Sequence, residues 1–376
     1  MIQLNKCYSL LGWIFITASV IHATALVVSS DQSTIAALSH SATNHDTTSY
    51  VYSRFQTRIK YQIKSFITLN TWLDIESYWA NKSLSSLGIK TDYQNNKLPI
   101  TLYKSLYRSD FYQLNAVLKR AYAVISLSNS DIRYGLQQFP VGVGIIFRPT
   151  DIINTYDVLN QMLADQLGLV GILYQYNLSP VAQWQVMATH NDKRLIHKGG
   201  RLLLNINNID ISTTYINHEG GHMIGVDYVS GIEKLGSTIY SEIAMSQAND
   251  TSKYGIEIVF GFNTLVYDHL SLLLELYAKH GNINNVYQEN SNQEWPFQSS
   301  YYLANQLQYQ LGPLFSLSHT WILNMNDMSW VSLPRINVSL RENLDGIIGG
   351  SFAFGDSNSE FNAYPNQLIV GLNYFF

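Results

Sequence analysis

The chain ends in the stretch Asn366-Gln-Leu-Ile-Val-Gly-Leu-Asn-Tyr-Phe-Phe376, in which every second side chain is apolar. One face of an extended strand would carry Leu368, Val370, Leu372, Tyr374 and Phe376. The sequence stops on this face without a polar tail, whereas the ends of soluble chains usually fray into water. We therefore expect a last strand whose apolar face contacts lipid. A buried last strand of a soluble sandwich is the alternative.

Longer segments upstream alternate in the same way, at 51–63, 67–79, 254–262 and 270–279. A strand that crosses a membrane needs about 9–11 residues, whereas the average soluble strand has about 5–6. After residue 25 no segment is apolar for long enough to predict a membrane-crossing helix. Strands must then make the crossing, and only a closed barrel leaves no unpaired strand edge in lipid.

The predicted connections alternate in length, which is typical of outer-membrane barrels. Short turns are predicted at Lys64-Ser65, Asn207-Asn208, Gly312-Pro313 and Glu342-Asn343, and longer polar stretches at 80–109, 150–167 and 281–298. The predicted fold is all-β, a transmembrane antiparallel up-and-down β-barrel formed by residues 50–376. We expect about 16 strands, within a range of about 14 to 18, because bacterial barrels prefer even numbers.

The amino-acid composition agrees with a protein that has a lipid-facing surface, but it does not decide the fold by itself. Charged residues make up 13% of the chain, against about 25% in soluble domains, and aromatic residues also reach 13%. The net charge is −4, so the chain has no excess of basic residues that would indicate binding of nucleic acid. Cys7 is the one cysteine, which excludes a disulfide framework and a cysteine-based metal site, and suits the periplasm and outer membrane.

Residues 1–25 have the organisation of a secretory signal peptide. Lys6 precedes the apolar run 10–20, and Ala23-Thr24-Ala25 matches an A-x-A cleavage site. The apolar run is shorter than the about 20 residues of a membrane-spanning helix, and an uncleaved anchor is the alternative. Residues 26–49, rich in Ser, Thr and His from Ser29 onward, are predicted to be an unpaired periplasmic lead-in.

Three stretches resemble a family of poorly characterised, porin-like bacterial outer-membrane barrels. The first comprises Ile132-Arg-Tyr-Gly-Leu-Gln-Gln138, Gly142-Val-Gly144 and Phe147-Arg-Pro-Thr-Asp-Ile-Ile-Asn154. The second comprises Asn343-Leu344-Asp345 and Phe354-Gly-Asp-Ser-Asn-Ser-Glu-Phe361, and the third is Tyr374-Phe375-Phe376. The chain departs from the pattern at Leu136, where Arg is common, and at Pro140-Val141, where a Trp-rich stretch is usual.

The resemblance implies a barrel in the outer membrane of a Gram-negative-type cell, and little about its cargo. The closing strand similarly resembles the C-terminal signal that the outer-membrane barrel assembly machinery reads. Within that strand the signal would be carried by Leu368, Val370, Leu372, Tyr374 and Phe376.

One motif points to different chemistry. His218-Glu219-Gly220-Gly221-His222 matches H-E-x-x-H, in which two His one helical turn apart bind zinc and the Glu is the general base. Asp227 would be the third ligand of a secreted zinc metalloprotease, one residue early for the extended motif. Two mid-helix Gly would cost about 1 kcal/mol each relative to Ala, and 209–216 and 223–229 are strand-like.

We therefore interpret 217–222 as a Gly-rich loop between two strands, and expect neither an enzyme, nor a cofactor, nor a metal site. A loop that binds a metal through the two His without catalysis remains an alternative.

The polar faces of the strands are expected to set pore selectivity. They carry charges of both signs, at Arg54, Arg58, Lys60, Asp74, Glu76, Glu257, Glu275 and Lys279. Opposite charges on neighbouring strands fit a transverse field across a constriction, but they could equally pair and brace the wall of a narrow or closed lumen.

We expect a porin-like channel that passes small hydrophilic solutes across the outer membrane, with membrane lipid and the assembly machinery as its other partners. The alternatives are a structural or adhesive surface barrel with a plugged lumen, and the zinc metalloprotease.

Overall fold

The computed structural model describes residues 25–40, 47–83, 103–154, 168–190, 195–218, 220–249, 254–281 and 297–376. Residues 1–24, which hold most of the predicted signal peptide, lie outside the described residues. No helix within these ranges is long and apolar enough to cross a membrane.

The described residues form 19 strands and two single-turn 3-10 helices, η2 (Glu233–Leu235) and η3 (Phe361–Ala363). The strands are β1 (Ala25–His40), β2 (Thr47–Lys64), β3 (Ile67–Ala80), β4 (Tyr103–Arg108), β5 (Tyr112–Ser126), β6 (Ser130–Gln137), β7 (Leu169–Ser179), β8 (Ala182–His190), β9 (Leu195–Ile206), β10 (Ile209–His218), β11 (Gly221–Ile232), β12 (Ser237–Ala248), β13 (Tyr254–Tyr267), β14 (Leu270–Gly281), β15 (Tyr301–Gln310), β16 (Phe315–Asn324), β17 (Trp330–Arg341), β18 (Leu344–Phe354) and β19 (Asn366–Phe375).

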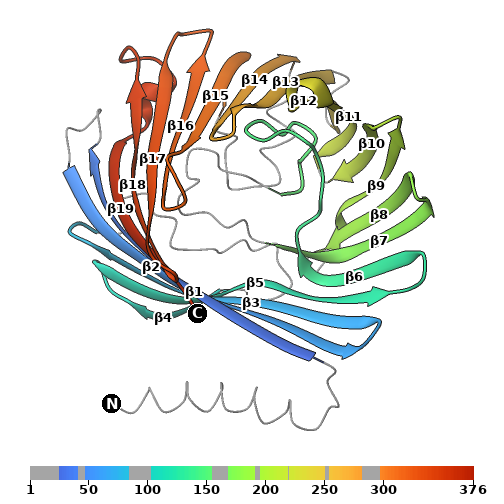
Figure 1. Cartoon of the computed structure of the whole chain (residues 1–376), viewed down its shortest axis with the longest axis horizontal. Helices are drawn as coiled ribbons and strands as arrows, with labels where there is room; N and C mark the ends of the chain where they lie inside the picture. The colour runs from blue at the N-terminus through green and yellow to red at the C-terminus, as the bar shows by residue number, and fades with distance from the viewer. Residues whose placement is uncertain are drawn as a thin grey trace.

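Eighteen of the described strands close into one antiparallel up-and-down barrel (Figure 1). Neighbours along the chain pair with each other, β3 pairs with β5, and β1 closes the ring by pairing with β19. The remaining strand, β4, pairs with β5 at Gln113–Val117, next to the part of β5 that pairs with β6. The prediction of a closed barrel is confirmed, and 18 strands is the upper limit of the predicted range, two above the central estimate.

The segment predicted as a periplasmic lead-in is different in the structure. Within 26–49, β1 pairs along its whole length with β2, and ten of its residues, from Asp31 to His40, pair with β19. Among the described residues, the barrel therefore includes β1 from Ala25 onward, and does not start at residue 50. Polar Ser and Thr residues at outward positions of β1 hid the alternation. One of them, Thr34, is satisfied across strands, since its Oγ1 lies 3.0 Å from the Oγ of Ser53 on β2.

Side chains alternate between the outside and the inside of the wall, as the sequence predicts. On β13, Ile256 and Ile258 are 39% and 42% exposed, whereas Glu257 between them is 1% exposed. The closing strand shows the same pattern, with Leu368, Val370 and Leu372 exposed and Ile369 buried. The outer surface is thus an apolar belt, and the inner surface is polar and largely covered.

The four predicted short turns are all confirmed, and they lie at one end of the barrel. At the turn between β9 and β10, Asn207 and Asn208 have positive φ angles of 52° and 64°, which fit a tight hairpin. Ala25 and Phe376 lie near this end, since β1 and β19 start and finish beside the turns.

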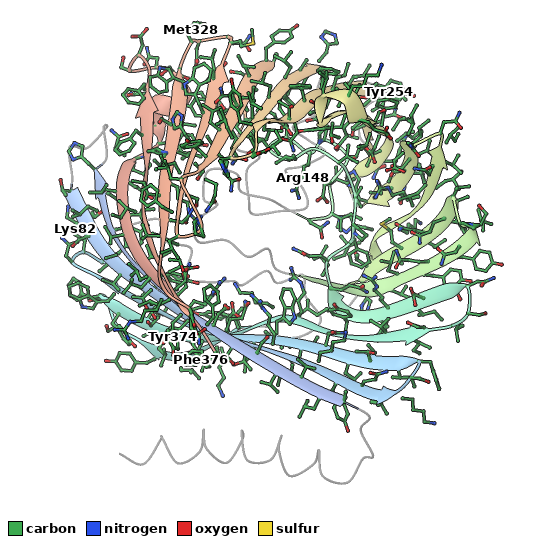
Figure 2. The ribbon with its side chains drawn as sticks, in the orientation of Figure 1. Lys82, Arg148, Tyr254, Met328, Tyr374 and Phe376 are labelled. Atoms are coloured by element: carbon green, nitrogen blue, oxygen red, sulfur yellow. The ribbon has the colours of Figure 1, made fainter. Side chains whose placement is uncertain are left out.

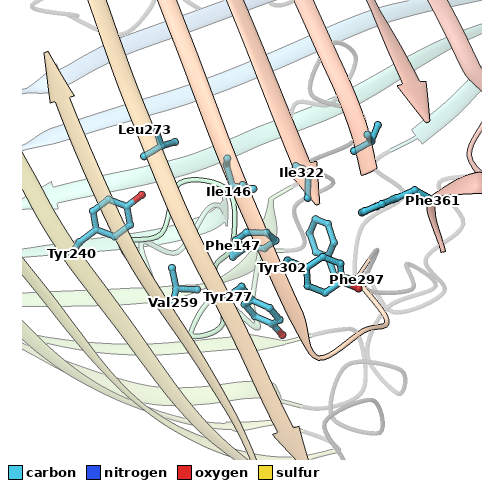
Figure 3. Packing of buried hydrophobic residues seen from close by; sticks show 12 residues of the cluster. Ile146, Phe147, Tyr240, Val259, Leu273, Tyr277, Phe297, Tyr302, Ile322 and Phe361 are labelled. Carbon is cyan, nitrogen blue, oxygen red and sulfur yellow. The ribbon is translucent and has the colours of Figure 1, made fainter. Parts of the chain in front are cut away.

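A segment of the chain covers part of the inner wall. Residues 138–154, which follow β6 in its connection to β7, run inside the barrel (Figure 1); we call them the inner loop. Phe147 of the inner loop stacks on Tyr277 of β14, with ring centroids 5.1 Å apart, and contacts Phe297 and Tyr302 (Figure 3). This aromatic cluster belongs to an apolar core between the inner loop and the wall strands β12–β17.

Candidate functional site

One carboxylate on the wall receives the middle of the inner loop. Glu275, fully buried on β14, accepts hydrogen bonds from the backbone amides of Ile145 (2.7 Å), Ile146 (3.0 Å) and Phe147 (2.9 Å). The hydroxyl of Tyr240 on β12 donates to the same carboxylate. Amides of successive residues that converge on one anion form a nest, so the negative charge of Glu275 is matched by oriented dipoles.

A second carboxylate holds the flanks of the same loop. Glu242 on β12 accepts from the amides of Val143 (2.8 Å) and Gly144 (2.9 Å), and from both the amide and the hydroxyl of Thr150 (2.6 Å each). The Thr150 hydroxyl also lies 3.3 Å from Asp227 on β11. The two wall carboxylates therefore fix both the tip of the inner loop and its flanks.

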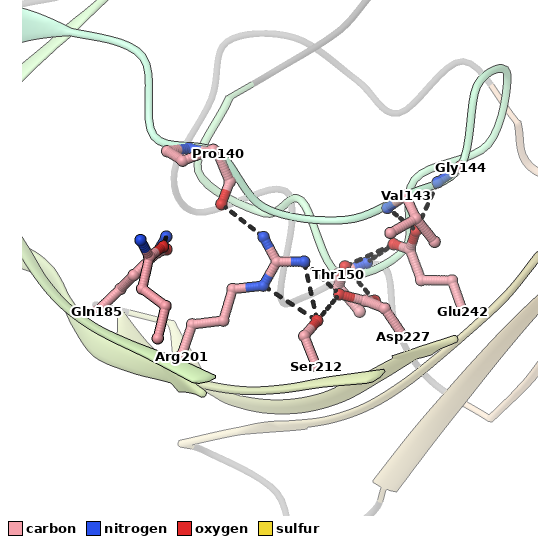
Figure 4. A network of polar contacts seen from close by, with 10 residues as sticks. Pro140, Val143, Gly144, Thr150, Gln185, Arg201, Ser212, Asp227 and Glu242 are labelled. Carbon is pink, nitrogen blue, oxygen red and sulfur yellow. Dashed lines mark hydrogen bonds and ion pairs between the residues drawn. The ribbon is translucent and has the colours of Figure 1, made fainter. Parts of the chain in front are cut away.

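Arg201 on β9 extends this network toward the start of the inner loop (Figure 4). Its guanidinium donates to the carbonyl of Pro140 (3.0 Å), to Ser212 on β10 and to Asp227 (2.9 Å). Ser212 in turn donates to Asp227 over 2.6 Å. Arg201 is 7% exposed and its charge is balanced by Asp227, so this group braces the wall.

Beside the inner loop lies a cavity of about 320 Å³ that is rich in arginine. Its lining includes Arg120 of β5, Arg133 of β6 and Arg148 and Asp151 of the inner loop, with Trp72 of β3. Figure 2 shows Arg148 inside the barrel, and its Nε donates to the carbonyl of Gly144 over 2.8 Å. Three guanidinium groups against one carboxyl group make this part of the lumen electropositive; we call it the arginine pocket.

Asp151 is the one acidic residue among those that line the arginine pocket. Burial raises its pKa to about 7, although the amide and side chain of Asn154 both donate to its Oδ1 over 2.9 Å and the positive charge of Arg148 opposes the rise. The charge of the pocket therefore depends on pH near neutrality.

A β-bulge in β5 supplies two adjacent inward cations. Trp72 pairs with Arg120 and Leu73 with Leu118, so Lys119 is the extra residue and both Lys119 and Arg120 are buried on the inner side. The guanidinium of Arg120 lies 5.5 Å from the centre of the Trp72 ring, and Arg58 lies 5.3 Å from it. The bulge thus directs one cation toward the arginine pocket and the other toward two carboxylates.

Those carboxylates are Asp74 and Glu76, two of the predicted pore-lining residues. Lys119 Nζ lies 3.0 Å from Glu76 and 3.7 Å from Asp74, and Gln56 donates to Asp74 over 2.9 Å. All four side chains are nearly or fully buried. This cluster agrees with the alternative in which interior charges pair and brace the wall.

The other predicted pore-lining residues also occupy inward positions but do not form one site. On β2, the inner face that carries Gln56 also carries Arg54, Arg58 and Lys60. The guanidinium of Arg58 lies 3.5 Å from the carboxylate of Asp31. Glu257 accepts from the Tyr277 hydroxyl, and Lys279 donates to the carbonyl of Phe297 over 2.9 Å. That these residues line the conducting path remains a prediction.

Sequence reasoning missed several parts of the candidate site: the inner loop, Glu242, Arg120 and Arg133. Glu242 alternates with apolar residues on β12 as Glu257 does on β13, so its inward direction could have been predicted. The bulge at Lys119 is visible in the sequence only as a break in the alternation of β5. The binding of the inner loop by carboxylates about 100 residues away leaves no pattern in the sequence.

The H-E-x-x-H motif forms no helix. His218 is the last residue of β10 and lies on the inner side of the wall. His222 on β11 alternates in step with the exposed Ile224 and Val226, which places it on the outer side. The two rings therefore belong to opposite faces of the wall. Asp227 is bound to Arg201 and Ser212, and Glu219 lies outside the described residues. The predicted loop 217–222 is shorter than expected, because both His belong to strands.

Among the described residues, no group of three His, Cys, Asp or Glu is placed to hold a metal ion. The zinc-protease alternative is therefore unsupported.

No protein-family model matches the sequence, and no curated protein matches it. Solved structures do resemble it. OccAB4 of Acinetobacter baumannii shares 10% identity over 94% of this chain and 99% of its own, with a TM-score of 0.60. A BenF-like porin of Pseudomonas fluorescens Pf-5 shares 9% identity over 94% and 99%, with a TM-score of 0.61. OpdK of Pseudomonas aeruginosa, solved with vanillate, shares 8% identity over 93% and 98%, with a TM-score of 0.56. The chain therefore has the closed-barrel fold of the Occ, Opd and BenF-like porins.

Proposed function

We propose that this protein is an outer-membrane channel that passes small hydrophilic solutes and prefers small organic anions. The observation that carries the proposal is the arginine pocket, which opens beside a fixed loop inside a closed barrel. Arg120, Arg133 and Arg148 give this part of the lumen an excess of positive charge, and charged side chains that line a pore set its ion preference.

The class of solute follows from the chemistry of the lining. Guanidinium groups match carboxylates in shape and hydrogen-bonding geometry. The vanillate in the OpdK structure is a carboxylate, which agrees with this assignment. The apolar outer belt supports location in the outer membrane, with lipid around the barrel.

Planar-bilayer recording of the purified protein tests the proposal. We expect stable conductance steps and, in a salt gradient, a reversal potential that favours the anion. Replacing Arg133 or Arg148 by Gln should move the reversal potential toward the cation, whereas Arg341→Gln, at an exposed position at the end of β17, should leave it unchanged.

The same recording separates the alternatives. A barrel with a plugged lumen would insert without conductance steps, and that result would overturn the channel. Steps with no anion preference, or a preference that survives loss of both arginines, would leave a pore but remove the assigned solute class.

A further inference from the structure

A second cavity borders the inner loop at Val143 and lies toward the short turns. Its volume is about 430 Å³, and it is lined by residues of the β7–β8 turn at Ser179–Ala182, by the ends of β9 and β10, and by Val143 of the inner loop. For comparison, an apolar cavity of roughly 150 Å³ is large enough to bind benzene. The space therefore suits a small organic body.

The chemistry of this cavity differs from that of the arginine pocket. Its charged lining consists of Arg201 and Asp227, which form an ion pair of 2.9 Å, and Asp210, which accepts from Asn205 over 2.7 Å. Inward apolar side chains come from Leu203 on β9, Val229 on β11 and Val143. A second anion has no cation to meet here that is not already bonded, whereas a methylene chain or ring meets three aliphatic groups.

We propose that this cavity is a second subsite of the channel, which takes the apolar body of an organic anion. The inference rests on the proposed function, because it assumes that organic anions enter through the arginine pocket. The inner-loop segment 140–143 contributes Pro140 and Val141 to one cavity and Val143 to the other, so both cavities border the same four residues of the loop. The preferred solutes are then carboxylates with an apolar body instead of the smallest ones.

Block of the chloride current by straight-chain carboxylates tests the subsite. Acetate, butyrate and hexanoate carry the same charge and differ only in methylene groups, and each methylene that is fully buried should tighten binding about fourfold. We expect the half-blocking concentration to fall by about fivefold or more from acetate to hexanoate, which allows for partial burial. Addition to both sides of the bilayer removes any dependence on the direction of insertion.

Two substitutions remove the apolar surface with little change in volume, Leu203→Asn and Val229→Thr. Together they should abolish the dependence on chain length and leave the effect of acetate as in the wild type. Leu333→Asn, on the inner face of β17 away from this cavity, is the matched control and should keep the dependence. Val229→Thr is isosteric and should still reduce the dependence if the double variant does not fold.

The outcomes separate the two proposals. If acetate blocks the current but the wild type shows no dependence on chain length, or the variants keep it, the second subsite is overturned and the anion channel stands. If acetate has no effect and the arginine variants do not change the reversal potential, the proposed function itself fails.

Discussion

The backbone amide of Phe147 donates to the carboxylate of Glu275 over 2.9 Å, although 128 residues separate them in the chain. Glu275→Gln replaces one acceptor oxygen by an amide group that can only donate. Burying amides without acceptors costs about 1–3 kcal/mol, so the inner loop should dock less firmly. We expect a larger and noisier single-channel conductance with weaker anion preference.

Glu257→Gln is the matched control, because Glu257 lies on the intervening strand β13 and accepts from the Tyr277 hydroxyl. A wild-type current from Glu275→Gln would contradict the role of Glu275 as an anchor of the loop.

Gly144 lies where the inner loop turns between its two anchors. A Cβ atom at this position would stand 1.8 Å from the carbonyl oxygen of Phe147, a backbone atom that cannot move without breaking the contacts to Glu275. We therefore expect Gly144→Ala to change the conductance as Glu275→Gln does, while the barrel still forms. Gly231→Ala, at a position with no atom within 4 Å of the added Cβ, should behave as the wild type in bilayer recording.

The sequence is sufficient to predict the wall of this molecule, because the pleat of a strand forces neighbouring side chains to opposite faces. Ile256, Glu257 and Ile258 show this directly. The same rule could not place β1, where Ser and Thr occupy outward positions and bond to each other across strands, as Thr34 and Ser53 do.

The candidate site was harder to predict than the wall, because it depends on contacts that leave no periodic pattern. Glu275 was predicted to line the pore; its side chain lies on the inner side of the wall, but it is fully buried there against the backbone amides of a distant loop. Arg120 faces the lumen only because the bulge at Lys119 shifts the alternation by one residue.

The ionisation of Asp151 is expected to make the anion preference of the channel depend on pH. Its pKa, raised to about 7 by burial, means that the carboxyl group is neutral below this pH and charged above it. The arginine pocket then gains positive charge as the pH falls, so the anion preference measured by reversal potential should rise between pH 8 and pH 6. Asp151→Asn should show the high preference at both values. A variant that still shifts with pH would assign the effect to another group.

Substitution of Lys119 tests how much the buried charge cluster on the wall contributes to stability. Its ammonium group lies 3.0 Å from Glu76 and 3.7 Å from Asp74, and all three side chains are at most 3% exposed. Removing one partner of a buried ion pair costs about 3–5 kcal/mol, because the remaining charges stay buried. We expect Lys119→Met to lower the free energy of unfolding by this order in denaturant titrations of the folded barrel.

Adding Asp74→Asn and Glu76→Gln to Lys119→Met should recover part of the loss, since no uncompensated charge then remains. Lys104→Met, at an exposed position on β4, is the control and should change stability little. Full stability of Lys119→Met alone would show that water or other groups already neutralise the cluster.

Phe376 allows the predicted assembly signal to be tested apart from stability. Its ring lies on the outer face, 4.6 Å from the Tyr374 ring and 6.0 Å from Phe55, while its amide donates to the carbonyl of Ser30 over 2.8 Å. Phe376→Ser keeps the backbone bond and removes the aromatic end of the apolar face. If the face is read during insertion, the fraction of heat-modifiable, folded barrel in the membrane should fall.

Phe375 provides the matched control. It lies on the inner face of β19, as Ile369 does, and it is also an exposed aromatic residue at the same end of this strand. Phe375→Ser removes a similar area without touching the outer face, so its folded fraction should stay near that of the wild type. Purified, refolded samples of both variants should unfold at similar denaturant concentrations, because each loses an exposed terminal ring, 46% exposed at Phe375 and 64% at Phe376. An equal loss of folded barrel for the two variants would assign the effect to stability and would contradict recognition of the outer face.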